Sequence, residues 1–386
     1  MKNSYLYDAV RTPRGKAKSD GGLATFSPQG LVKHQLDALR QRAGHGVSTP
    51  DALLLGCVGQ VGAQGGHIAL VSKLHSGLPD GTAAHSINNY CASGLSAIGQ
   101  AAALVESGQA GSVLAGGVEM MSRVPFMGDR ASYYDDASFP HRARYIPVVL
   151  AADRLANAER LDRAALDAVA LASQQKAGAA ENDPVLQRSR IATDTLSGEE
   201  CIRPATTADT LAAMEPAFGA LQAQYSDALG GATFDPLHSV SHAPPVCDGA
   251  GLALVGGPDL TPHPRARILA FAESGGDPEA SLTAGFSAME KVLARAGLTL
   301  ADIDRIEFME AFAVTIAKFL RDYSVDPDRV NVGGGHIAKG HPMGASGAIL
   351  ASTLLDCLDA CDGNLGLVVV SGASGVGAAM IVERLN

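Results

Sequence analysis

Residues 92–108, "ASGLSAIGQAAALVESG", and residues 345–360, "ASGAILASTLLDCLDA", open with the same Ala-Ser-Gly and continue as small and apolar residues. In each copy an apolar run follows the helical pattern, "SVLAGG" from Ser112 and "LVVVSG" from Leu367. The spacing from the glycine to this run is 18 residues in the first copy (94 to 112) and 20 in the second (347 to 367). The chain therefore contains one helix-then-strand unit twice, which indicates two duplicated halves.

The faces of these segments indicate how the halves pack. Both helical segments are apolar on most sides, which is typical of a helix buried between layers of sheet. The two runs that follow are continuously apolar, as in strands covered on both faces. We therefore predict an α/β fold whose two halves form one five-layer α/β/α/β/α body with buried central helices.

The middle of the chain differs from both halves in its composition and in its hydrophobic pattern. Residues 120–233 carry charge-rich helical patterns with Pro and Gly breaks and little strand signal. We predict an inserted, mostly helical subdomain over 120–233, an amino-terminal half over 1–119 and 234–260, and a carboxy-terminal half over 261–386. The boundary between the halves is expected in "GGPDLTPHPRARI", where Pro and Gly concentrate before an apolar strand.

Composition excludes several classes of protein. The chain has 386 residues, 46% hydrophobic, and a net charge of −10 without a Lys/Arg run, which argues against a nucleic-acid surface. Its six cysteines form no Cys-x-x-Cys pair, and the amino terminus lacks the apolar segment of a signal peptide, so we expect a cytoplasmic protein. Residues 365–382, "LGLVVVSGASGVGAAMIV", are long enough to raise the question of a membrane span. Their Gly and Ser cluster favours two buried strands joined by a turn.

Cys91 is the first candidate for chemistry, in "INNYCASG" (residues 87–94). At the amino end of a buried helix, free N–H groups and the helix dipole favour the thiolate, which lowers the pKa of a thiol and makes it nucleophilic. A small buried hydrophobic residue is the commoner fate of a cysteine. This stretch alone leaves both interpretations open.

His341 is the second candidate, in "GGGHIAKGHPMGASG" (residues 333–347). The stretch is not a phosphate-binding P-loop, because no Gly-Lys-Ser/Thr leads into the helix. His341 stands six residues before Gly347, near the point that Cys91 occupies in the other half. A cysteine and a histidine brought together in this way are a nucleophile and its activating partner, although His336 or His341 could be purely structural.

Two further groups are weaker candidates. Cys357 and Cys361 lie four residues apart on one helix face, but without a matching histidine or acid they do not indicate a metal site. The two histidines of "DPLHSVSH" (residues 235–242) are expected to be surface or packing residues.

The motifs taken together resemble the thiolase family, in particular the degradative acetyl-CoA acetyltransferase and 3-ketoacyl-CoA thiolase branch. The resemblance runs in order over essentially the whole chain and is carried by "VRTPRGK", "INNYCASGLSAI", "AGGVEMMSRVPF", "RPATTADTL", "DGAGLALV", "MEAFA" and "GGHIAKGHPMGASGA". Each motif alone is weak, whereas the ordered combination is specific.

The resemblance implies acyl transfer in two steps. Cys91 would take the acyl group from a coenzyme A thioester, His341 would activate it, and the backbone N–H groups of Cys91 and Ala373 would form an oxyanion hole. Acyl-CoA and coenzyme A would be substrates, with no permanently bound cofactor and no metal. The residues expected at the coenzyme A side are Ala311, Phe312, Ala243 and Pro244. The family also implies a homodimer or homotetramer, which we expect to be built around the strand that follows the nucleophilic helix.

Two positions depart from the family pattern. Met309 precedes "EAFA" where family members usually have Asn or His, whose side chain fixes a water for the second oxyanion hole; a thioether donates no hydrogen bond. Ser371 stands at the position of the second, acid/base cysteine, and an alkyl hydroxyl is a far weaker acid than a thiol. The resemblance therefore leaves acylation of Cys91 intact and the enolate half of the reaction impaired.

Three functions follow from this reading. The first is a thiolase-type acyltransferase that performs thiolysis or Claisen condensation through acyl-Cys91, on an ordinary substrate or on an atypical one that needs less help at the α-carbon. The second is an acyl-CoA hydrolase, or transfer of the acyl group to another acceptor. The third is a catalytically reduced thiolase-like subunit that binds acyl-CoA.

Overall fold

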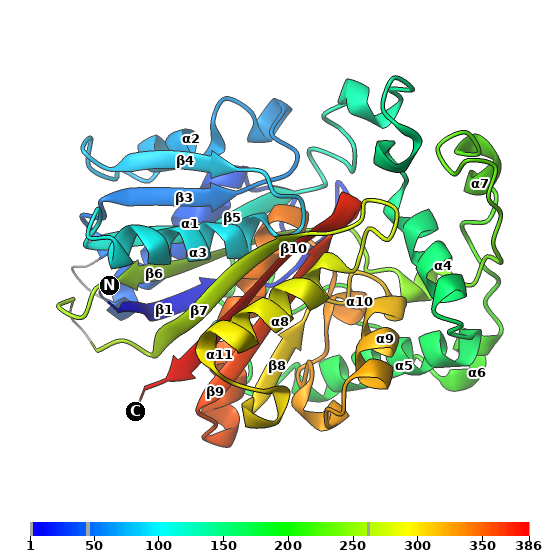
Figure 1. Ribbon diagram of the computed structural model, residues 1–386. Helices are drawn as coiled ribbons and strands as arrows, with labels where there is room; N and C mark the ends of the chain where they lie inside the picture. Colours follow the sequence, from blue (N-terminus) through cyan, green and yellow to red (C-terminus); the bar gives the residue numbers. More distant parts are fainter. Residues whose placement is uncertain (1–2, 44–46, 261–262, 386) are drawn as a thin grey trace.

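The computed structural model describes residues 3–43, 47–260 and 263–385, and one mixed β-sheet runs through the whole of it (Figure 1). Ten strands of the described residues belong to this sheet: β1 (Ser4–Arg11), β2 (Gly15–Lys16), β3 (Ala52–Gly56), β4 (Ala83–Ile87), β5 (Ser112–Met120), β6 (Cys247–Gly256), β7 (Ala266–Gly275), β8 (Arg305–Phe308), β9 (Leu365–Gly372) and β10 (Val376–Arg384). Apart from β2, which pairs with β6, their order is β4-β3-β5-β6-β1-β7-β10-β9-β8.

The sheet order repeats itself about its centre. Reading outward, β1-β6-β5-β3 is matched by β7-β10-β9-β8, and in both halves only the outermost of these pairs is parallel. The two halves join where β1 and β7 pair in antiparallel fashion, with Ser4 opposite Ile268. The predicted α/β fold is therefore confirmed, and the duplication seen in the sequence is a duplication of strand order.

Helices cover both faces of the sheet and fill its centre. They are α1 (Pro28–Ala43), α2 (Ile68–His75), α3 (Ser93–Glu106), α4 (Val148–Ala158), α5 (Arg163–Ala180), α6 (Ala208–Ala212), α7 (Leu221–Gln224), α8 (Ala284–Ala296), α9 (Ala313–Asp322), α10 (His336–Lys339) and α11 (Ser346–Cys361). α1 and α2 pack on the strands of the first half and α8 on those of the second, while α3 and α11 lie between the halves against strands of both. This arrangement gives the five layers.

The amino-terminal turns of α3 and α11 are in direct contact because each carries a glycine there. A Cβ atom on Gly347 would lie 2.5 Å from the backbone nitrogen of Leu95, and a Cβ on Gly94 would lie 2.8 Å from the carbonyl oxygen of Gly344. Both distances are shorter than any ordinary contact. The repeated Ala-Ser-Gly therefore allows two helix starts to meet at one point.

The chain between β5 and β6, all of it described, forms helices, turns and loops and no strand. Its helices α4 to α7 lie together beside the sheet (Figure 1, green). Only α4 and α5 are longer than five residues, so much of this segment is irregular. The boundaries at residues 119/120 and 233/234 stay a prediction, and the boundary at 260/261 falls on residues 261–262, which lie outside the described residues.

The edges of the sheet bear on the expected assembly. β5, the strand that follows the nucleophilic helix, pairs with both β3 and β6, so it offers no free edge to a second copy. β4 stands at the end of the strand order and its residues are only partly buried. A strand flanked on both sides has no backbone groups left to pair, so β5 itself cannot extend the sheet into a second copy. The expectation that an oligomer is built around this strand stays a prediction.

The apolar segments that raised the question of a membrane are part of the core. Residues 365–382 form most of the hairpin of β9 and β10, as predicted. Within the described residues one helical span, Met343–Cys361, is long and apolar enough to cross a membrane, and 83% of its apolar window is buried inside the protein. That burial is typical of the core helix of a globular protein.

The contact between the central helices predicts a position-specific loss of stability. Gly347→Ala places a methyl group against the backbone of Leu95, and overpacking of this kind costs about 1–3 kcal/mol of unfolding free energy. Gly178→Ala in α5 is the matched control: its Cβ would meet Pro204 at an ordinary 3.6 Å, so the gain in helix propensity should stabilise the protein by about 0.5–1 kcal/mol. Urea denaturation of both variants measures the difference, and equal effects would contradict the proposed packing.

Candidate active site

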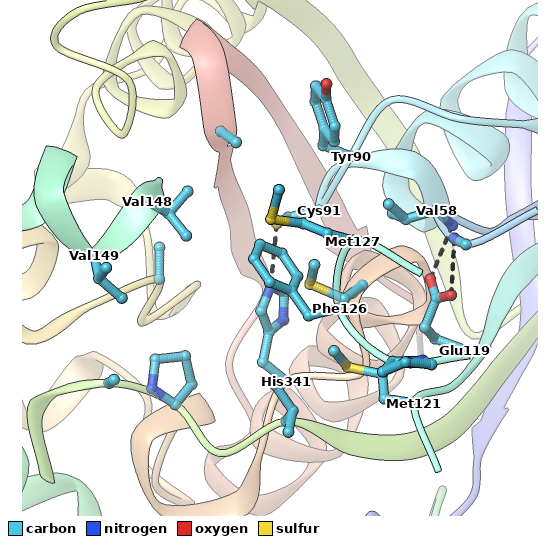
Figure 2. A pocket seen from close by; sticks show the side chains of 18 of the residues that line it. Val58, Tyr90, Cys91, Glu119, Met121, Phe126, Met127, Val148, Val149 and His341 are labelled. Carbon is cyan, nitrogen blue, oxygen red and sulfur yellow. Dashed lines mark hydrogen bonds between the residues drawn. The ribbon is translucent and has the colours of Figure 1, made fainter. Parts of the chain in front are cut away.

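Cys91 and His341 meet at the junction of the two halves. The Sγ of Cys91 lies 3.1 Å from Nε2 of His341, although the two residues are 250 positions apart in the chain (Figure 2). Cys91 lies two residues before the start of α3, and His341 stands in the loop before α11. The contact of the two helix starts therefore also brings together the two side chains that the sequence singled out.

A tight turn between β4 and α3 holds Cys91. Tyr90 has a positive φ of 44°, a conformation that few residues other than glycine adopt. The hydroxyl of Ser93 fixes the turn, because it donates to the carbonyl oxygen of Tyr90 at 2.6 Å and accepts from the backbone N–H of Asn89 at 2.8 Å. This turn aims the Cys91 side chain away from the helix and toward His341.

Three contacts hold His341. Its Nδ1 lies 2.6 Å from the hydroxyl oxygen of Ser346, and its backbone N–H donates to the carbonyl oxygen of Pro245 at 2.8 Å. The guanidinium of Arg14 donates to the carbonyl oxygen of the preceding Gly340 at 3.2 Å. When Nδ1 carries the proton and donates to Ser346, Nε2 is free to accept the proton of the Cys91 thiol.

The resting pair is neutral. Burial raises the pKa of Cys91 to about 12, against the lowering effect of hydrogen bonds from the backbone N–H groups of Ala373 and Cys91 itself. Burial, with the positive charge of Arg14, lowers the pKa of His341 to about 3. The expectation of a lowered Cys91 pKa was wrong, because desolvation outweighs the fixed N–H donors. The thiol therefore needs His341 as a base at the moment of reaction.

An apolar cavity of about 270 Å³ opens onto this pair. Its wall includes Ala373 and the four residues expected at the coenzyme A side, Ala243, Pro244, Ala311 and Phe312. Bulky residues from the segment after β5, among them Met121, Phe126 and Met127, form another part of the wall (Figure 2). The structure thus gathers at one cavity seven of the nine residues that the sequence and the resemblance nominated.

Met309 and Ser371 do not line this cavity. Both are fully buried; Met309 lies in the main hydrophobic core. The hydroxyl oxygen of Ser371 accepts the backbone N–H of Gly285, in the first turn of α8, at 3.1 Å. Because side chains alternate along a strand, Ser371 on β9 faces the outer helix, while the next residue, Gly372, lies against the backbone of Cys91.

Two residues of the site were given no role by the sequence reasoning. Ser346 belongs to the Ala-Ser-Gly repeat, so its place beside His341 follows only once the helix start is known. Glu119 lies in "AGGVEMMS" and lines the cavity, where its carboxylate accepts backbone N–H groups of Val58 at 2.8 Å, Gly59 at 3.1 Å and Gly344 at 3.0 Å. It ties the loop after β3 to the loop that follows His341.

The three other histidines that the sequence reasoning considered are buried. His336 packs edge-on against His341, with ring centroids 5.2 Å apart, and neither of its ring nitrogens has a partner among the described residues. His238 and His242 lie 2.7 Å from Asp153 and Asp167 respectively and are fully buried. His238 and His242 were expected to be surface or packing residues, and the structure shows that they are packing residues. Their contacts fix the segment that carries Ala243.

Comparison with known proteins identifies the family. The thiolase N-terminal domain model matches residues 4–224, and the thiolase C-terminal domain model matches residues 262–384. The chain belongs to the thiolase family. It is 36% identical to an acetyl-CoA acetyltransferase of Escherichia coli over all of both chains, and 34% identical to a β-ketoadipyl-CoA thiolase of Pseudomonas knackmussii over 99% of each.

A solved structure supports the same assignment. The crystal structure of human mitochondrial 3-ketoacyl-CoA thiolase matches with a TM-score of 0.85 and 28% sequence identity, over 100% of this chain and 99% of the human one. The thiolase fold predicted from the sequence is therefore confirmed over the whole length.

A buried ion cluster ties the segment between β5 and β6 to the site. Glu199, from this segment, accepts from Arg11 at 2.6 Å and from Arg14 at 3.2 Å, with all three side chains almost fully buried. Burial alone would raise the pKa of Glu199, but the two arginines and Lys339 hold it well below its usual range. Since Arg14 also holds the loop of His341, the cluster connects this segment to the reactive pair.

The protonation state of Cys91 can be read from its alkylation. With a thiol pKa of about 12, the rate of Cys91 modification by iodoacetamide should rise about tenfold per pH unit from pH 7 to pH 10 without levelling, since only the thiolate reacts. Peptide mass spectrometry locates the label, and Cys91→Ala provides the background. A plateau reached by pH 8 would mean that the thiol is already ionised in the resting protein.

Proposed function

We propose that this protein is a thiolase-type acyltransferase that acts on 3-oxoacyl-CoA and acyl-CoA through an acyl-Cys91 intermediate. The observation that carries the proposal is the 3.1 Å contact between Cys91 and His341 at the wall of an apolar cavity, in a chain of the thiolase family. Acetyl-CoA acetyltransferase and 3-ketoacyl-CoA thiolase are the names of several of its relatives, which supports the same reaction class.

The first step is acylation of Cys91. As His341 takes the thiol proton, Sγ attacks the C3 carbonyl of 3-oxoacyl-CoA and the C2–C3 bond breaks, so the electron pair leaves on C2 as the enolate of acetyl-CoA. The backbone N–H groups of Cys91 and Ala373, both within reach of Sγ, are placed to receive the negative charge that develops on the C3 oxygen. One such donor is worth about 2.7–4 kcal/mol of transition-state stabilisation.

The proton needed in the next step is already at hand. C2 of the enolate requires one proton to become acetyl-CoA, and His341 holds the one that it took from Cys91. The sulfur of coenzyme A then attacks the carbonyl carbon of acyl-Cys91 while His341 takes the thiol proton. The bond between that carbon and Sγ breaks, His341 returns the proton to Cys91 Sγ, and the new acyl-CoA leaves. Because Ser371 and Met309 lie outside the cavity wall, we assign both proton transfers to His341 rather than to the position of a second cysteine.

The remaining expectations are proposals of the same kind. Ala243, Pro244, Ala311 and Phe312 would contact the pantetheine arm of coenzyme A, which is a substrate rather than a resident cofactor. The protein would be a cytoplasmic homodimer or homotetramer. The partly buried edge strand β4 supports assembly by pairing with a second copy.

The decisive experiment follows the acyl group. We expect incubation with 3-oxoacyl-CoA to produce an acyl adduct on Cys91 in mass spectra and, on addition of coenzyme A, a shortened acyl-CoA. Cys91→Ala should give neither, whereas Cys201→Ala, which removes another buried free thiol, should give both. Release of the acyl group from the adduct as a free carboxylic acid, without added coenzyme A, would instead identify a hydrolase. Tight acyl-CoA binding without any adduct would identify a binding subunit and refute the proposal.

The placement of Ser371 predicts a split between stability and activity. Ser371→Ala removes the acceptor for the buried N–H of Gly285, and leaving such a donor unpaired costs about 1–3 kcal/mol of unfolding free energy. Thiolysis by the folded variant should stay within about threefold of the wild type, since the hydroxyl does not face the cavity. Ser371→Cys is the control that restores a weak acceptor, and a gain of more than about tenfold in kcat for that variant would show that position 371 reaches the substrate.

A further inference from the structure

Apart from the residues expected at the coenzyme A side, much of the cavity wall is built from bulky apolar groups. In Figure 2 Val148 and Val149 lie on one side of Cys91, and Met121 lies on the other. Further aromatic, sulfur-containing and aliphatic side chains complete this part of the wall: Tyr90, Val124, Phe126, Met127, Tyr134 and Tyr145. If the pantetheine arm takes the side of Ala243 and Phe312, the acyl tail must extend along these residues.

The charged side chains at the cavity wall are both acidic. Within the described chain the lining contains Glu119 and Asp129 but neither lysine nor arginine. The carboxylate of Glu119 is occupied by backbone donors and by Gln64 at 2.6 Å. Asp129 accepts the hydroxyl of Tyr134 at 2.9 and 3.0 Å. A substrate carboxylate that entered the cavity would therefore meet two acidic side chains and no lysine or arginine among the lining residues.

The arginines nearby are directed elsewhere. Arg123 donates to the carbonyl oxygen of Ala24, and Arg144 is paired with Asp227. Arg130 is exposed and lines a separate surface depression together with Asp135 and Asp136. Moving any of these guanidinium groups into the cavity would break a contact or leave a cluster of acids uncompensated.

From this wall we propose that the acyl substrate has an uncharged, apolar tail, and that the site rejects a tail that ends in a carboxylate. An apolar tail gains from burial against Met, Phe and Tyr side chains, whereas an unpaired carboxylate loses its hydration there. The inference rests on the proposed function. It separates this protein from relatives named for the β-ketoadipyl group, which ends in a carboxylate.

A matched pair of substrates tests the inference. 3-Oxohexanoyl-CoA and 3-oxoadipyl-CoA have the same six-carbon chain and differ at its end, CH₃ against COO⁻. We expect kcat/KM for thiolysis of 3-oxohexanoyl-CoA to be higher by about 100-fold or more, because burying an unpaired charge is strongly unfavourable. A ratio below about tenfold, or a reversed one, would overturn the proposal.

A substitution that adds a cation to the cavity wall provides a second test of the inference. Phe126 lines the cavity and is 43% exposed, so it accepts a larger polar side chain without entering the core. Phe126→Arg should shift the ratio toward 3-oxoadipyl-CoA by about tenfold or more by supplying the missing partner, while Phe126→Leu should leave it unchanged. No shift with Arg, or an equal shift with Leu, would show that charge does not set the preference.

Binding measurements separate this inference from the proposed function. Cys91→Ala removes the nucleophile and leaves the acyl wall intact, so calorimetric Kd values for the two substrates report on the wall alone. If the wild type cleaves neither substrate but the variant binds 3-oxohexanoyl-CoA at least about tenfold more tightly, the reaction proposal fails and the inference stands. If the wild type cleaves both equally well, the reaction proposal stands and the inference fails.

Discussion

The contact between the first turns of α3 and α11 is the constraint on which the rest of the structure depends. It is possible only because Gly94 and Gly347 leave no Cβ where the two backbones meet. The contact fixes the angle at which the halves join and places Cys91 and His341 within 3.1 Å. If the two helix starts could not approach, the thiol of Cys91 and the imidazole of His341 would stay in separate halves. The thiol would then have no base within hydrogen-bond distance.

The same burial that brings the pair together also decides its protonation. A thiol with a pKa near 12 and an imidazole with a pKa near 3 store no ion pair, so reactivity has to come from a proton transfer coupled to attack. Fixed N–H groups of Cys91 and Ala373 are then worth more than a charged neighbour, because they cost no reorganisation when the negative charge appears on the substrate oxygen. The nucleophile of this site is therefore a buried neutral thiol rather than a permanently ionised thiolate.

The sequence predicted what depends on local pattern and repetition. The Ala-Ser-Gly repeat and the continuous apolar runs were sufficient for the α/β fold, the buried helices and the pairing of Cys91 with His341. Nothing in the local pattern of β1 or β7 could show that these strands pair across the halves. The predicted direction of the pKa shift of Cys91 was wrong because desolvation depends on residues that are distant in the chain. The direction of Ser371 depends on strand register, which a family alignment does not provide.

The reacting residues and the residues of the apolar cavity wall come from different parts of the chain. The groups that carry the chemistry are therefore separate from those that would select the acyl group. Cys91, His341 and Ala373 stand on the duplicated halves, where a shift of one residue would disturb the helix contact or the sheet. Phe126 and Met127 come from the irregular segment after β5, and neither side chain is fully buried, so exchange there is tolerated more easily than in the core. On the proposed reaction, we expect a change in that segment to alter which acyl group is accepted without moving the reacting atoms. The buried cluster around Glu199 acts on the fixed pair instead, since Glu199 holds Arg14 and Arg14 holds the carbonyl oxygen of Gly340 next to His341.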